Sequence, residues 1–232
     1  MIDLSTPHGF QGVADDQPRT VELREVPHWR VSGASYLVTW RLADALSPEQ
    51  LAELQAHRTA WEQRHPPPHE PAAMEQLDRL ITERVQRWLD RGQGSCLVQQ
   101  PAIAAAVIHA LHERDQVDYE LAAYLLMPNH VHAIVRPLLT ALDDIVAHWQ
   151  ATSIQQISAQ QTAANSPNHE LHWHPQFFSR LVRDPDHLYR CVQYLARNPL
   201  WSGLTADKCP HWIRPDWSAL GWNLEVPRSK KQ

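Results

Sequence analysis

The chain has 232 residues, a hydrophobic fraction of 43% and a formal net charge of −5 at pH 7. This length and composition are typical of one large globular domain, and no apolar run approaches the ~18 residues that a membrane span needs. Its three cysteines lack a C-x-x-C pattern, which argues against a cysteine-based zinc site. Because the first residues also lack the features of a secretion signal, we expect a cytoplasmic protein with reduced thiols.

The acidic charge balance counts against nucleic-acid binding, because such binders usually carry a basic footprint. Net charge does not report local charge, however, and one short segment contains Arg180, Arg183, Arg190 and Arg197. These side chains either contact DNA or form a solvated surface. The ten tryptophans leave a similar choice, since exposed indoles can stack on unpaired bases whereas buried ones fill a core.

The first elements are signalled by composition and by helix caps. Residues 1 to about 30 are polar and aperiodic, which predicts an extended or partly ordered tail. Residues 34–42 are rich in β-branched and aromatic side chains and predict a strand. Residues 47–50 (SPEQ) combine an N-cap, a proline at the first helical position and a capping-box glutamine. The helix that they open should run to about Arg64, just before three consecutive prolines.

Apolar residues recur at helical spacing between Met74 and Leu89 and predict a second helix, which Gly92 and Gly94 end. Together the two helices predict an inserted helical arm over residues 47–92. Pro101 opens a third helix with one apolar stripe.

Residues 119–135 are the most apolar stretch and split at Met127-Pro128-Asn129, which predicts an antiparallel hairpin. Thr140 can cap the next helix, and residues 161–175 are polar and loop-like. Residues 177–182 predict a short strand. A last helix should begin at Asp184-Pro185 and end at Pro199.

Strands in separate stretches with long helices between them indicate an α+β fold, an antiparallel sheet flanked by helices. We expect residues 31–205 to form this domain, with residues 1–30 and the Trp- and Pro-rich residues 206–232 as tails.

Two histidine pairs could bind a metal ion. His130 and His132 lie two apart in a predicted strand, so their side chains project from the same face and could converge on one ion. The alternative is two hydrogen-bonded histidines without a ligand, although polar rings in an otherwise apolar strand are costly when unpaired. His172 and His174 have the same spacing in a loop-like setting, and we interpret them as surface histidines.

Tyr194 and Asn198 are four apart on the last predicted helix and therefore share a face, at the edge of the apolar stripe. A side chain at that edge can reach a neighbouring sheet while it also touches solvent. Packing is the commoner role of a helical tyrosine. Tyr189 lies on another part of the helix and is the weaker candidate.

Residues 127–132 (MPNHVH) and 194–199 (YLARNP) resemble the two signature motifs of the REP-associated tyrosine transposases, a group of single-tyrosine HUH transposases. The resemblance covers roughly residues 34–204, including Tyr36–Thr39 as a first strand, residues 178–184 before the tyrosine helix and Gly203-Leu204 after it. It implies an HUH/ferredoxin-like sheet that acts on single-stranded or hairpin DNA.

The resemblance also implies a role for each site residue. His130 and His132 would ligate Mg²⁺ or Mn²⁺, with Asn198 as third ligand, and Tyr194 would be the nucleophile that forms a 5′-phosphotyrosine bond. Mn²⁺ should be preferred in vitro, because Mg²⁺ favours oxygen ligands. The protein would be a monomer or a homodimer.

The chain departs from the family pattern at two positions. Ser179 stands where an aspartate is common, and Gln150 or Ala151 where a lysine is common. These departures bear on DNA contacts, and with the acidic charge they favour an alternative function, a domesticated DNA-binding protein with little turnover.

Overall fold

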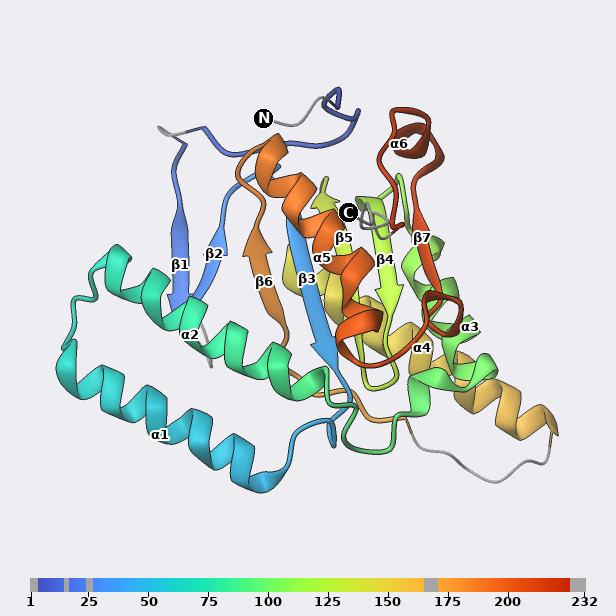
Figure 1. Ribbon diagram of the computed structural model, residues 1–232, viewed down its shortest axis with the longest axis horizontal. Helices are drawn as coiled ribbons and strands as arrows, with labels where there is room; N and C mark the ends of the chain where they lie inside the picture. The colour runs from blue at the N-terminus through green and yellow to red at the C-terminus, as the bar shows by residue number, and fades with distance from the viewer. Residues whose placement is uncertain (1–3, 15–16, 24–26, 165–170, 226–232) are drawn as a thin grey trace, which may run out of the picture.

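A five-stranded antiparallel sheet forms the centre of the protein, with strand order β6-β3-β5-β4-β7 (Figure 1). The computed structural model describes residues 4–14, 17–23, 27–164 and 171–225. The strands are β3 (Tyr36–Arg41), β4 (Tyr119–Leu126), β5 (His130–Pro137), β6 (Phe178–Leu181) and β7 (His211–Ile213). The predicted hairpin is β4–β5, and the Met127-Pro128-Asn129 turn joins its strands as expected.

Helices cover both faces of this sheet (Figure 1). The helix α5 (Pro185–Trp201) lies on one face, and α3 (Pro101–Glu113) and α4 (Leu142–Ala164) lie on the other. The predicted α+β class, an antiparallel sheet flanked by helices, is therefore confirmed. No helix in the described ranges has both the length and the apolar character needed to cross a membrane.

Side chains of the central strands alternate between two cores. Tyr36, Val38 and Trp40 of β3 pack in the core with α3 and α4, whereas Leu37 packs in the core with α5. On β5, Ile134 belongs to the α5 side. Because side chains two apart share a face of a strand, His130 and His132 project toward α5 as well.

The predicted arm consists of α1 (Pro48–Arg64) and α2 (Pro71–Leu89). Ser47 and Gln50 form the capping box that the sequence predicts. Only Trp61 of α1 is buried, whereas α2 buries a stripe from Met74 to Leu89 and contacts the strand β2 (Pro27–Arg30). The arm is thus fixed to the domain chiefly through α2.

Two predicted boundaries are wrong. The helix α4 continues to Ala164, into the segment expected to be loop-like, and residues 165–170 lie outside the described residues. The helix α5 continues through Pro199 to Trp201. Proline this close to a C-terminus removes a single hydrogen bond. The helix ends at Trp201, two residues before Gly203, whose φ of 69° suits the left-handed residue that follows a helix C-terminus.

Both terminal segments contain structure that the sequence did not indicate. β1 (Thr20–Leu23) and β2 (Pro27–Arg30) form a two-stranded sheet within residues 1–30, of which 1–3, 15–16 and 24–26 are outside the described residues. β7 pairs with β4 and adds the C-terminal segment to the main sheet, and the short α6 (Pro215–Ala219) follows. Residues 226–232 lie outside the described part of the chain.

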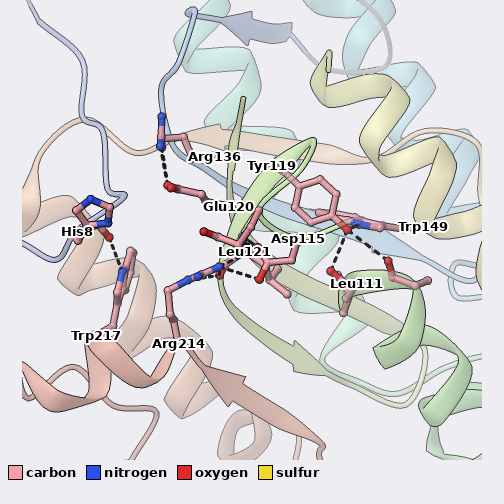
Figure 2. Close-up of polar contacts among 12 residues, drawn as sticks. His8, Leu111, Asp115, Tyr119, Glu120, Leu121, Arg136, Trp149, Arg214 and Trp217 are labelled. Atoms are coloured by element: carbon pink, nitrogen blue, oxygen red, sulfur yellow. Dashed lines mark hydrogen bonds and ion pairs between the residues drawn. The ribbon is translucent and has the colours of Figure 1, made fainter. Parts of the chain in front are cut away.

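Polar contacts fix the C-terminal segment in place (Figure 2). The Arg214 guanidinium pairs with the Asp115 carboxylate at 2.8 Å and donates to the Leu121 carbonyl. The Trp217 indole donates to the His8 carbonyl at 2.8 Å, so the two terminal segments also contact each other. The buried Trp217 and Trp222 then complete the core beneath α5.

Candidate active site

The two histidines of β5 contact each other beneath α5. Their Nε2 atoms lie 3.0 Å apart, and His130 and His132 are 1% and 0% exposed. The Met127-Pro128-Asn129 turn directly precedes β5, the strand that carries both histidines. In the antiparallel pairing of β5 with β3, Thr39 lies opposite His132. The strand alternation expected from the sequence therefore brings both rings together.

Each ring is also held at its other nitrogen. The Nδ1 atom of His130 lies 2.7 Å from Asn129 Oδ1, and the Nδ1 atom of His132 lies 2.7 Å from Thr39 Oγ1. Since an amide oxygen can only accept, His130 donates from Nδ1 and accepts at Nε2. His132 must then donate from Nε2 and accept the Thr39 hydroxyl at Nδ1. The histidine pair is neutral and fully hydrogen-bonded without a ligand.

Burial keeps both imidazoles uncharged. Loss of solvation lowers the pKa of His132 to about 3. Burial, and then the neighbouring His132 ring, lowers the pKa of His130 well below its usual range. Neutral imidazole is the form that ligates a metal ion, so neither ring needs to lose a proton to solvent first.

Tyr194 on α5 packs edge-on against this pair, with its ring centroid 5.3 Å from that of His132. Asp184 caps the helix by accepting from the His187 amide, and the apolar stripe that starts at Leu188 sets the rotation that turns Tyr194 toward the sheet. The ring is partly exposed at its edge, whereas its hydroxyl oxygen is buried and makes no hydrogen bond of ordinary geometry to the described residues.

The surroundings of the Tyr194 hydroxyl favour its neutral form. Burial and then the Asp90 carboxylate raise its pKa far above the ordinary value of a phenol. Arg180 and the side chain of Asn198 act in the opposite direction and favour the phenolate. A nucleophilic role therefore requires further activation of this oxygen.

Asn198 is fully buried one turn after Tyr194. Its Nδ2 donates to Asp90 Oδ1 at 3.4 Å, while its own Oδ1 has no hydrogen-bond partner among the described residues. Burial raises the pKa of Asp90 to about 6, and the bond from Asn198 offsets part of that rise. Asp90 follows α2 directly, and no sequence signal connected it with residues 108 positions away.

The donor set fits the divalent ion that the sequence resemblance implies. Two neighbouring ligands of an octahedral ion with bonds of ~2.1 Å lie ~3 Å apart, which is the spacing of the two Nε2 atoms. Within the described part of the chain, no group of three or more His, Cys, Asp or Glu side chains could hold a metal. A third protein ligand from these residues would be of another type, and Asn198 Oδ1, which is buried without a hydrogen-bond partner among them, is an atom of that type.

The four arginines that the sequence indicated as possible DNA contacts lie in two different places. Arg180 lies on β6, where its charge acts on the Tyr194 hydroxyl, and Arg183 pairs with Glu75 of α2 at 3.2 Å. Arg190 and Arg197 are exposed on the solvent side of α5. Only the first two therefore face the arm.

The weaker candidates lie apart from this cluster. Tyr189 packs against Trp222, with ring centroids 6.2 Å apart. His172 is exposed, and the Gln176 amide donates to the ring of His174. The segment between them is not a free loop, because Trp173 forms a β-bridge with Leu42.

Comparisons with known proteins find similarity among solved structures only. No family model matches the sequence, and no curated protein matches it. Among solved structures, the chain is similar to a REP-associated tyrosine transposase bound to a REP hairpin, with a TM-score of 0.41 and 15% sequence identity. The similarity covers 79% of this chain and 75% of that chain, and at this level it assigns neither a family nor an activity.

Proposed function

We propose that this protein cleaves and rejoins single-stranded or hairpin DNA, with Tyr194 as nucleophile and a divalent metal ion as cofactor. The observation that carries the proposal is the packing of the Tyr194 ring against His132, which contacts His130, while the buried Asn198 acts on the Tyr194 hydroxyl. These are the residues that the motif resemblance names, and they come from segments more than 60 positions apart in the sequence.

His130, His132 and Asn198 would hold Mg²⁺ or Mn²⁺. When bound, the ion supplies electrophilic polarisation of the scissile phosphate and stabilises the departing oxygen. Tyr194 Oη gives up its proton and bonds to phosphorus, the P–O3′ bond breaks, and the 3′-oxygen leaves as a hydroxyl. Arg180 favours the phenolate, and the buried position of the hydroxyl excludes bulk water from the ester. Because the ester retains the bond energy, strands can be rejoined without ATP.

A second candidate function is DNA binding without useful turnover. The two positions that depart from the family pattern are engaged inside the fold, since Ser179 Oγ accepts from Arg30 at 3.2 Å and Gln150 donates to the His174 carbonyl at 3.1 Å. The raised pKa of Tyr194 and the net charge of −5 favour this alternative as well.

A covalent-adduct assay distinguishes the two. The protein is incubated with labelled hairpin-bearing single-stranded DNA and Mn²⁺, then denatured and separated by electrophoresis. We expect an adduct with the wild type and with Tyr189→Phe, a matched change on the same helix, and none with Tyr194→Phe. Tight binding without an adduct would support the binding protein. Absence of binding would contradict both functions.

A further inference from the structure

A groove runs along the arm between α2 and α5. Two hollows of about 270 and 700 Å³ lie between these elements and adjoin at Glu83, which lines both, and together they are called the groove. Along α5 its wall consists of His187, Tyr194 and Trp201, which recur every seven residues on one side of the helix. The helices approach at their C-terminal ends, where Asn198 donates to Asp90, and diverge from there with β6 between them (Figure 1).

The groove is more basic than the rest of the chain. Six arginines and four carboxylates line it, whereas the whole chain has a net charge of −5. One carboxylate, Glu75, is already paired with Arg183. The arginines are Arg19, Arg79, Arg180 and Arg183 at the wide end, and Arg87 and Arg91 beside Tyr194. A local excess of guanidinium groups in an acidic protein suits a polyanion.

Trp201 lies at the end of the groove where α2 and α5 approach each other, next to the candidate nucleophile. Its ring is 56% exposed, whereas the other nine tryptophans are buried or half-buried. The centroids of the Trp201 and Tyr194 rings lie 5.7 Å apart. An exposed indole face beside arginines can stack an unpaired base.

We propose that this groove is the binding track for an unpaired DNA strand, which follows α2 and places the base beside the scissile phosphate on Trp201. Arg180 and Arg183 contact phosphates at the wide end, and Arg87 and Arg91 contact them near Tyr194. The inserted arm thereby forms one wall of the substrate site. This inference rests on the proposed function, because it takes Tyr194 as the point that the strand must reach.

The test measures binding in a Tyr194→Phe background, where no covalent step can occur. Fluorescence anisotropy with a labelled single strand gives the affinity at several salt concentrations. We expect Trp201→Ala to weaken binding by roughly 5- to 100-fold, and Trp201→Phe to retain most of the affinity. Arg87→Gln should lower the slope of log affinity against log salt by about 0.7, whereas Arg64→Gln on the outer helix of the arm should leave it unchanged.

A second readout separates stacking from a change in fold. A strand with 2-aminopurine at successive positions should lose fluorescence at one position on binding, and Trp201→Ala should abolish that loss. Unchanged affinity and an unchanged 2-aminopurine signal in Trp201→Ala and Arg87→Gln would overturn the proposal that the groove binds the DNA strand. If these variants lose affinity while the wild-type protein never forms an adduct, the groove binds DNA and the proposed strand cleavage is wrong. If a labelled acidic peptide binds the wild-type protein and a labelled single strand does not, the groove binds protein and the proposal is wrong.

Discussion

The Nε2 atoms of His130 and His132 lie 3.0 Å apart and share one proton in the ligand-free protein. An ion bound by both nitrogens must displace that proton. The tautomer of His132 must then change so that Nδ1 carries the hydrogen, and the Thr39 hydroxyl must turn from donor to acceptor. Thr39 can fill both roles, because a hydroxyl carries a hydrogen and lone pairs.

Replacing Thr39 should therefore weaken metal binding more than it disturbs the fold. We expect Thr39→Val to bind Mn²⁺ about 10- to 100-fold more weakly than the wild type, since second partners of ligating histidines have effects of this size. Thr39→Ser retains the hydroxyl and should bind within a few-fold of the wild type. Isothermal titration calorimetry measures both. Equal Mn²⁺ affinity in all three proteins would contradict the role of Thr39.

The stability of the metal-free protein should fall in acid partly through His132. Its folded pKa of about 3 lies below the unfolded value of ~6.5, so between these values only the unfolded chain binds the proton. Stability from this group is present above pH 6.5 and is lost as the pH falls toward 3. Asp78 and Asp90, whose folded pKa values are about 6, act in the opposite sense, so a comparison of variants is needed.

We expect His132→Gln to reduce the pH dependence of the free energy of unfolding below pH 6 by up to ~1.4 kcal/mol per pH unit. Urea unfolding between pH 7 and pH 5, without divalent ions, measures the slope. His172→Gln, at an exposed position, is the matched control and should keep the wild-type slope. An unchanged slope in His132→Gln would show that the ring is already protonated or that the site opens in acid.

Asn129 should matter for stability as well as for the site. Its buried amide donates to the Leu89 and Gln93 carbonyls and its oxygen accepts from His130. We expect Asn129→Ala to lower the free energy of unfolding by about 1–3 kcal/mol, because these buried groups lose their partners. Asn223→Ala removes two exposed side-chain bonds and should change stability by about 0.5 kcal/mol or less. Equal effects would contradict the structural role.

The C-terminal segment should be part of the folding unit. Trp217 is 2% exposed and packs beneath α5, so Trp217→Ala should cost about 3–5 kcal/mol. The exposed Trp201→Ala should cost about 0.5 kcal/mol or less. Thermal and urea unfolding compare the two. If both variants are as stable as the wild type, residues beyond 205 are a dispensable tail.

Local signals account for what the sequence predicted. The capping box at Ser47 and the alternation around His130 act over a few residues, so they could be read without knowing the fold. The strand β7 could not, because it has three residues at the edge of the sheet and forms only by pairing with β4. The sequence likewise did not indicate Asp90 as a site residue. Its place beside Asn198 depends on how the arm docks, which no local pattern encodes.

Asn129 also joins two parts of the molecule that are separate in the sequence. It precedes His130 directly, and its amide is bonded to the carbonyl of the last residue of α2. We therefore expect a ligand that shifts the end of α2 to move the His130 ring without contacting it, and an ion on the histidines would in turn alter the affinity for that ligand. By thermodynamic reciprocity the two couplings would be equal, and Asn129 would carry them together with Asn198, which is bonded to Asp90 directly after α2.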